Sequence, residues 1–215
     1  MTSLNQIISI LSERVGQPFN TALQDELKVI VNYKVANYFK QLLEKNPAQR
    51  KFFTKEIVVN LDKVDQSICP IDTIDCYFLK SIQKVPTPIR GNYALFDYVG
   101  TLDKQTAFGH STPEYLYFIK YNKYTANLSR YYYSDQYIYI LNDLNTPKIM
   151  VRGIWSDPRA LQGFLCADGS TCYTDDDNYP IPKDILQAII RDTLSVELRN
   201  IFPEQNEVKV DEQGT

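Results

Sequence analysis

The sequence predicts an α+β fold, in which an antiparallel sheet, sandwich-like or barrel-like, lies between helical ends. Apolar residues recur at helical spacing near both ends of the chain, and short segments rich in β-branched and aromatic residues follow one another between them. Strands without intervening helices pair as hairpins, so we expect antiparallel pairing. The expected parts are a helical hairpin over 1–50, an antiparallel β domain over 51–156, a loop and C-terminal helix packing on the hairpin as a small bundle over 157–202, and an acidic tail or arm over 203–215.

The composition indicates an ordinary folded protein. The chain has 215 residues, 44% of them hydrophobic, and a net charge of −3. A chain of this length buries about 70% of the surface that its unfolded form exposes. The negative charge argues against phosphate-backbone binding as the main activity, since that needs clustered Lys and Arg. We find neither a secretory signal nor an apolar run of bilayer length, so we expect a soluble protein that is made in a cytoplasm and has no membrane contact.

Two helices are expected at the N-terminal end. The first runs from a cap at Thr2 or Ser3 to about Val15 and is stopped at Gly16 and Pro18. The second begins after Asn20 or Thr21 and ends before the Asn46-Pro47 pair. Both have apolar residues spaced three and four apart, so their apolar faces require a covering layer.

The following residues show the two-residue period of strands. The Pro-rich segment 85–92 is expected to be a connection, because proline lacks the backbone donor of a sheet ladder. Polar turns are expected at 100–104 and 142–147. Strands are expected at 53–61, 76–82, 96–99, 106–108 and 148–155.

The segment from Tyr115 to Tyr139 contains nine of the sixteen tyrosines of the chain. Its alternation predicts strands, with turns at 121–129 and at Ser134-Asp135. Tyrosine combines a broad apolar ring with a hydroxyl that needs a partner, which suits a surface that another molecule buries. We therefore expect a face that is buried against another protein or a sugar, although the alternation alone does not decide which rings face outward. The expected interface residues are Tyr131, Tyr133, Tyr137 and Tyr139.

The last third returns to helix. A short helical turn is expected after Ser156-Asp157-Pro158, then a polar loop over 166–180, then a helix from Pro182 that ends at Phe202-Pro203. The final segment, 204–215, carries four acids and one lysine and has too few apolar residues to fold alone.

No metal site or cofactor site is expected. The four cysteines, at positions 69, 76, 166 and 172, form no CxxC pair, so we expect reduced, partly buried thiols. The acids Asp168, Asp175, Asp176 and Asp177 lack the spacing of an EF-hand, and a solvated turn is expected instead.

No catalytic residue is expected either. The single histidine, His110, accompanies no nucleophile elbow or cysteine-protease signature, and the eight glycines are too scattered for a phosphate loop. Glu56, Glu114 and Asp135 lie in the β region, but exposed strand and turn acids are common and these are expected to be solvated. The sequence therefore does not predict an enzyme.

Several segments together resemble the ring proteins of the neck of tailed bacteriophages, in particular those of crAss-like, short-tailed phages of gut Bacteroidota. The segments are ERVGQPFN, ELKVIVNYKVANYFKQLLEKN, KVDQSICPIDTIDCYFLKSIQKVPTPIR, YLYFIKY, YIYILN, IMVRGIW and IPKDILQAIIRDTLSVELRNIF. The resemblance implies a structural virion protein, a head-to-tail connector or portal adaptor in the neck or tail. It implies a cyclic oligomer, a dodecamer, that docks to the portal and to adjacent neck or tail rings, assembles in the host cytoplasm and has no enzymatic activity and no cofactor.

The residues fit this interpretation. A ring subunit needs two different flanking surfaces, which apolar helices and a tyrosine-rich sheet can supply. A negative channel lining would let passing DNA slide with transient, non-specific contact. The acidic tail is expected to order on the portal or on a neighbouring subunit. Its expected docking residues are Glu207, Val208, Val210 and Asp211.

Two other interpretations remain open. Aromatic side chains on an antiparallel sheet can form a platform for sugar rings, as in a carbohydrate-binding module or a receptor-binding virion component. Against this stand the long helices, which such sandwiches do not need. A hydrolase that uses scattered carboxylates ranks last.

Overall fold

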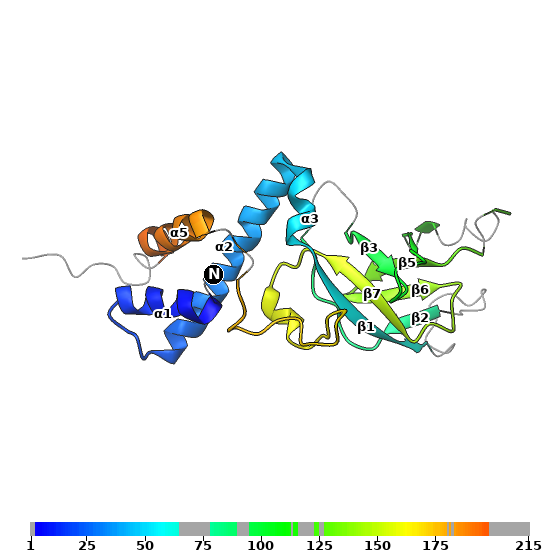
Figure 1. Cartoon of the computed structure of the whole chain (residues 1–215), viewed down its shortest axis with the longest axis horizontal. Coiled ribbons are helices and arrows are strands. Elements are labelled where there is room, and N and C mark those ends of the chain that lie inside the picture. The colour runs from blue at the N-terminus through cyan, green and yellow to red at the C-terminus, as the bar shows by residue number, and fades with distance from the viewer. Residues whose placement is uncertain are drawn as a thin grey trace, which may run out of the picture. The chain divides into compact units, whose positions relative to one another are not determined.

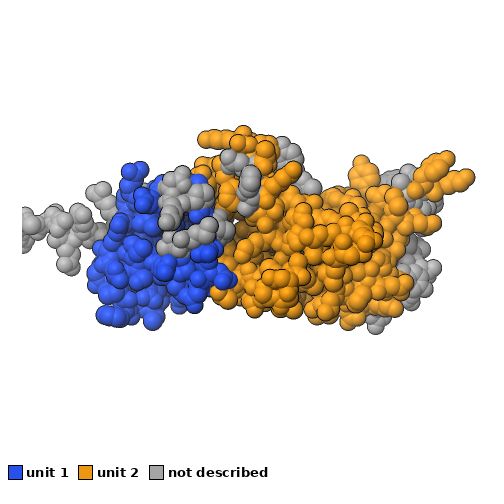
Figure 2. All heavy atoms as spheres, in the orientation of Figure 1, with its two compact units in different colours: residues 1–35, 175–215 blue, residues 36–174 orange. Residues whose placement is uncertain are grey.

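The computed structural model describes residues 3–64, 78–89, 95–112, 114–115, 123–124, 127–179, 181 and 183–197, and Figure 1 shows its elements. The expected tail docking residues therefore lie outside the described residues. The chain forms two compact units, residues 1–35 with 175–215 and residues 36–174, which Figure 2 shows in different colours.

The first unit is helical. It contains α1 (Leu4–Arg14), the first part of α2 (Thr21–Lys45), α5 (Lys183–Asp192) and a π-helical turn, η4 (Thr193–Glu197). Both expected N-terminal helices are confirmed. Ser3 and Gln6 form a reciprocal capping box at the start of α1. At the start of α2, the side-chain oxygen of Asn20 accepts a hydrogen bond from the backbone N–H of Leu23 at 3.1 Å.

Apolar side chains from all three helices form the core of this unit. Lys34 of α2 makes a salt bridge with Asp192 of α5, which adds a polar contact between these helices. The buried Tyr179 donates its hydroxyl proton to the side-chain oxygen of Asn32 on α2. The buried apolar residues are Leu4, Ile7, Ile8, Leu11, Leu23, Leu27, Val31, Val35, Tyr179, Leu186, Ile189 and Ile190.

Part of the expected polar loop binds the helices of this unit. The backbone N–H of Asn5 donates to the carbonyl of Asp175, and the Asn5 side chain donates to Asp176 at 2.8 Å. Lys28 of α2 lies 3.2 Å from the Asp175 carboxylate, whose side chain is only 19% exposed. The expectation of a solvated turn is therefore wrong for Asp175, since its charge is neutralised by a lysine from a distant part of the sequence.

The second unit contains the end of α2, two short helices and a sheet of seven strands. The short helices before the sheet are η1 (Pro47–Gln49) and α3 (Arg50–Phe53), and η3 (Pro158–Leu161) follows it, as the sequence predicted at Pro158. The strands are β1 (Lys55–Lys63), β2 (Phe78–Ser81), β3 (Tyr98–Gly100), β4 (Gly109–His110), β5 (Arg130–Ser134), β6 (Tyr137–Leu141) and β7 (Lys148–Gly153).

The strand order is β3-β7-β1-β2-β6-β5-β4, and the strands curl round as Figure 1 shows. Five of the neighbouring pairs are antiparallel, as expected, but β4 and β5 are parallel, so the sheet is mixed. The α+β class and a barrel-like sheet are confirmed. The inner face carries buried apolar side chains at alternate positions, among them Ile57, Val59, Leu61, Leu79, Val99, Ile138, Ile140, Ile149 and Val151.

One short segment, residues 106–110, joins the two ends of the sheet. The N–H of Phe108 donates to the carbonyl of Val99 in β3, and the N–H of Gly109 donates to the carbonyl of Ser129 next to β5. The close approach requires glycine at position 100, where a Cβ would lie 2.1 Å from the carbonyl oxygen of Thr106. The segment pairs antiparallel with β3 and parallel with β5, which explains the single parallel pair.

Two local expectations are corrected. Phe53 belongs to α3 and not to a strand, because its ring packs against Phe39 of α2 with centroids 4.7 Å apart. The β5–β6 turn is centred on Asp135 and Gln136, one residue later than expected, and both have positive φ, 52° and 68°. Positive φ at both central residues is the geometry of a tight hairpin turn whose twist matches that of its strands.

The expectation of reduced thiols is wrong for two cysteines. Cys166 and Cys172 form a disulfide, with Cα atoms 4.8 Å apart. A small hairpin brings them together, since the N–H of Cys166 donates to the carbonyl of Ser170 at 2.8 Å and Leu165 bridges Thr171. The cysteines at positions 69 and 76 lie outside the described residues.

Candidate assembly surface

The hairpin of β5 and β6 sorts the tyrosines onto two faces. Tyr131 is only 3% exposed and Tyr133 is half-buried, and both pack against the ring of Phe96, with centroids 6.2 and 5.3 Å away. The Tyr133 hydroxyl donates to the carbonyl of Val85 at 3.2 Å. Burial, and then the negative charge of Asp97, raise the pKa of Tyr131 to about 12. These two tyrosines belong to the inner face of the sheet.

The two other expected interface tyrosines, Tyr137 and Tyr139, lie on the outer face with residues that the sequence analysis did not single out. Tyr132 on β5 stacks on Tyr139, with centroids 4.5 Å apart and planes 4° from parallel. Phe78 on β2 approaches Tyr139 edge-on at 5.8 Å. The ammonium group of Lys80 lies 4.0 Å from the ring centre of Tyr137 and 5.7 Å from that of Tyr139. We call these five residues, Phe78, Lys80, Tyr132, Tyr137 and Tyr139, the outer aromatic cluster.

The pairing register explains the outer aromatic cluster. Tyr139 on the middle strand, β6, has a directly opposed residue on each neighbouring strand, Tyr132 on β5 and Lys80 on β2. Directly opposed residues share a face, so three neighbouring strands each contribute a ring or a cation. The expected turn at Ser134-Asp135 already places Tyr132 on the face of Tyr137 and Tyr139, because moving a two-residue turn by one residue changes the opposed pairs but not the faces. Phe78 and Lys80 depend on the long-range pairing of β2 with β6, which left no local signal.

The chemistry of the outer aromatic cluster suits contact with another macromolecule. Its five side chains are all half-buried, so part of each ring remains accessible. Burial, followed by the neighbouring Tyr139, raises the pKa of Tyr132 to about 12, so this phenol stays neutral near pH 7. Rings with hydroxyl tips and a basic group are typical of protein interfaces, where tyrosine is enriched.

A second polar cluster lies on the outer face of β1 and β7. Glu56 accepts hydrogen bonds from Arg152 Nε at 2.8 Å and from Lys104 Nζ at 3.0 Å, and Arg152 also lies over the ring of Tyr98. Burial raises the pKa of Glu56, but the hydrogen bonds and charges of Lys104 and Arg152 outweigh it, so the pKa is lowered overall. A carboxylate held ionised by two cations is a poor general acid.

The other residues weighed for catalysis do not form a site with Glu56. His110 lies exposed on β4, its ring 5.3 Å from that of Tyr131. Asp135 lies in the exposed β5–β6 turn. Glu114 is exposed, and a hydrogen bond from Thr112 lowers its pKa. Within the described residues, no group of three or more His, Cys, Asp or Glu side chains has the arrangement of a metal site.

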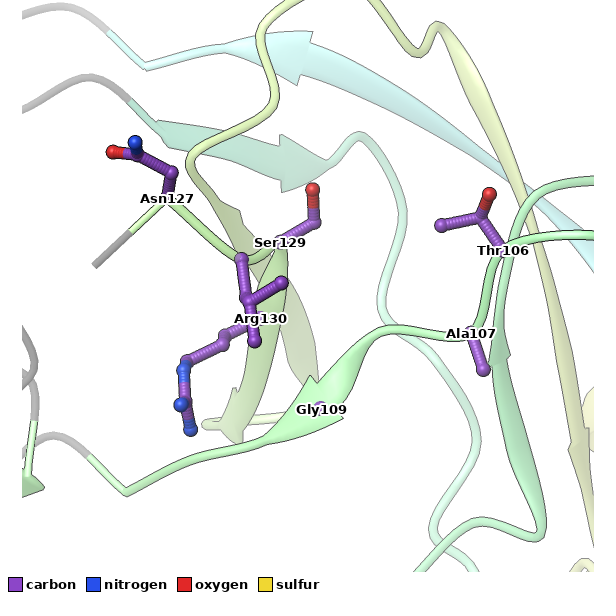
Figure 3. A pocket seen from close by; sticks show the side chains of 7 residues that line it. Thr106, Ala107, Gly109, Asn127, Ser129 and Arg130 are labelled. Atoms are coloured by element: carbon purple, nitrogen blue, oxygen red, sulfur yellow. The ribbon is translucent and has the colours of Figure 1, made fainter. Parts of the chain in front are cut away.

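An open groove of about 400 Å³ lies beside the segment that joins the ends of the sheet. Figure 3 shows Asn127, Ser129 and Arg130 on one side and Thr106 and Ala107 on the other. Its polar groups are hydroxyls, one amide and one guanidinium, without a nucleophile paired with a base. The groove lining therefore does not form a catalytic centre. The lining residues are Thr106, Ala107, Gly109, Asn127, Leu128, Ser129 and Arg130.

In the part of the chain that the structure describes, no helix is long and apolar enough to cross a membrane.

No curated protein matches the chain. A family model described as phage tail ring protein 2, for a family of crAss-like phages, matches residues 4–213, nearly the whole chain. The chain therefore belongs to the phage tail ring protein 2 family of crAss-like phages, and it is a structural ring component of the virion.

Proposed function

We propose that this ring protein is a head-to-tail connector in the phage neck, which docks to the portal and continues the DNA channel as a dodecamer. The observation that carries the proposal is the outer aromatic cluster. It displays three tyrosines, one phenylalanine and one lysine on a sheet whose ends are joined by one segment. A rigid scaffold with a partly exposed aromatic surface is what a permanent subunit contact requires.

The proposed ring contact uses the outward tyrosines, Tyr137 and Tyr139. Tyr131 and Tyr133 support the contact indirectly by holding β5 on the core through Phe96. A preorganised sheet loses little side-chain freedom on binding, which favours a ring that persists through assembly.

The proposed docking element is the acidic tail, residues 203–215, with Glu207, Val208, Val210 and Asp211 as its contact residues. The alternation of valine with charged residues over 207–211 is that of an extended arm with one apolar side. Such a segment orders only on a partner, and we propose the portal as that partner.

The proposed channel lining is acidic. The net charge of −3 supports a protein that repels DNA phosphates, as do exposed acids on each unit, Asp25 and Asp176 on the first and Asp103 and Asp168 on the second. Repulsion leaves DNA contacts transient and non-specific, which allows the genome to slide.

Native mass spectrometry of the purified protein, alone and mixed with purified portal rings, tests the proposal. We expect cyclic assembly on the portal, and weaker docking after deletion of residues 204–215 while the fold is retained. A strictly monomeric protein that ignores the portal would refute the connector function. Unchanged docking of the deletion variant would remove the tail from the proposal and leave the ring.

A carbohydrate platform on the same surface is the second candidate, because the outer aromatic cluster is partly accessible. The geometry favours it less. Tyr132 and Tyr139 stack on each other at 4.5 Å, and Lys80 covers Tyr137, so several ring faces are already occupied. A glycan array distinguishes the two, since specific glycan binding by a monomer supports the platform.

A further inference from the structure

Helix α2 carries apolar residues on two opposite sides. One side is buried in the cores, with apolar residues at every fourth position: Leu23, Leu27, Val31, Val35, Phe39 and Leu43. On another side, Val29 is 56% exposed and Tyr33 is 67% exposed. Ala22 and Glu26 are also exposed and continue this line at helical spacing. We call Ala22, Glu26, Val29 and Tyr33 the α2 stripe.

The exposure of Val29 and Tyr33 is not needed for the fold, because α2 already packs through its buried side. A soluble helix in a monomer ordinarily turns charged or polar residues to solvent on the side away from the core. Single exposed apolar residues are common, but a valine and a tyrosine one turn apart form a continuous contact area. The α2 stripe therefore has the character of a surface that a partner covers.

The charge of the α2 stripe is negative. Glu26 is exposed, and no salt bridge joins it to another described residue. Its neighbour Asp25 is 79% exposed and lies 4.0 Å from Lys28, which is closer to Asp175 at 3.2 Å. The stripe thus combines apolar area with at least one carboxylate that has no cation of its own.

The outer aromatic cluster has the complementary composition. Its charged group is Lys80, which lies opposite Asp62 of β1 in the pairing register without forming a salt bridge with it. The contacts of Lys80 within the described residues are the rings of Tyr137 and Tyr139. A ring of more than two copies needs two different surfaces on each subunit, because neighbours meet head to tail. One basic aromatic surface and one acidic apolar surface on the same chain meet that requirement, with opposite charges to fix the register.

We propose that the outer aromatic cluster of one copy packs on the α2 stripe of the next copy, with Lys80 of one chain paired to Glu26 of its neighbour. The inference rests on the proposed ring function and names the second surface of the contact. Val29 and Tyr33 supply the apolar area, and Tyr137 and Tyr139 cover it. The same pair of surfaces repeats around the ring.

Charge exchange tests the pairing. Lys80→Glu and Glu26→Lys each place like charges in the contact, so each is expected to raise the protein concentration needed for ring assembly at least tenfold. The double variant restores opposite charges and is expected to assemble close to the wild-type concentration. Lys63→Glu, at an exposed position on β1, is the control, because it makes the same change of charge outside the proposed contact. Tryptophan fluorescence and circular dichroism verify that every variant is folded.

A mixing experiment tests the head-to-tail arrangement. Val29→Asp blocks the α2 stripe and leaves the outer aromatic cluster intact, while Lys80→Glu does the reverse. At a protein concentration just above that needed for wild-type assembly, each variant alone is expected to remain monomeric, and a one-to-one mixture is expected to form heterodimers and nothing larger by native mass spectrometry. Self-association of either variant would overturn the arrangement, since it would require like surfaces to meet.

The outcomes separate this inference from the proposed function. Wild-type protein that forms no ring, alone or on the portal, refutes the proposed function. If wild-type protein forms rings and the Lys80→Glu and Val29→Asp variants assemble at the same concentration as wild type, the contact proposed here is overturned. The ring function then stands.

Discussion

Replacement of Glu56 by Gln is expected to destabilise the sheet unit by about 1–2 kcal/mol at pH 7. Glu56 accepts hydrogen bonds from Arg152 and Lys104, and the side chains of these cations are 36% and 47% exposed. Exposed ion pairs contribute roughly 0.2–1 kcal/mol each, and the two pairs here share one partly buried carboxylate. Glutamine keeps the shape but loses the charge, so both contacts weaken.

The contribution of Glu56 depends on pH in a direction set by its lowered pKa. A carboxyl group whose pKa is lower in the folded protein stabilises the fold above its unfolded pKa, near 4.5, and loses that contribution as the pH falls through the folded pKa. The difference in stability between wild type and Glu56→Gln is therefore expected to be full at pH 7 and to shrink as the pH falls below about 4.5.

Urea denaturation followed by fluorescence measures this difference. The single tryptophan, Trp155, is 6% exposed in the sheet unit, so its emission reports unfolding of that unit. With a slope of about 2 kcal/mol per molar urea, the expected loss lowers the midpoint by about 0.5–1 M at pH 7. Asp62→Asn, at an exposed position on the same strand, is the control and is expected to change little. Equal midpoints at pH 7, or a difference that persists unchanged at pH 3, would refute the reasoning.

Two further substitutions test buried polar contacts, one in each unit. Asp97→Asn is expected to cost about 3–5 kcal/mol in urea denaturation, because the Arg50 side chain is only 9% exposed and would lose the negative charge of Asp97 beside it; a loss below about 1 kcal/mol would contradict this. Tyr179→Phe removes the hydroxyl that donates to the buried Asn32 and is expected to cost about 1–2 kcal/mol, followed by circular dichroism at 222 nm; unchanged helix stability would show that this hydrogen bond contributes nothing net.

The helices were predictable because their signals are local. Ser3 and Gln6 stand at the spacing of a capping box, and Asn46-Pro47 forbids continuation of α2. Strand positions were also predictable, because β-branched and aromatic residues alternate between turn signals. The position of the β5–β6 turn was missed by one residue, because Asp135 and Gln136 are weak signals for positive φ.

The features that sequence reasoning missed depend on contacts between distant residues. The outer aromatic cluster joins Phe78 to Tyr139 through a pairing of β2 with β6 that no local pattern specifies. The ion pair of Lys28 with Asp175 depends on how the chain returns to its N-terminal helices. The Cys166–Cys172 disulfide depends on a small hairpin, since two cysteines six residues apart carry no pairing information by themselves.

The segment that joins the ends of the sheet also limits how copies of this protein can associate. An unpaired strand edge invites a strand from another molecule, and edge-to-edge addition has no natural stopping point. Here residues 106–110 hydrogen-bond to β3 with one part and to β5 with the next, which occupies backbone groups at both described ends of the sheet. Subunits crowded together during virion assembly are thereby steered away from fibrils and toward side-chain contacts, whose fixed angle lets a ring close at a finite number of copies.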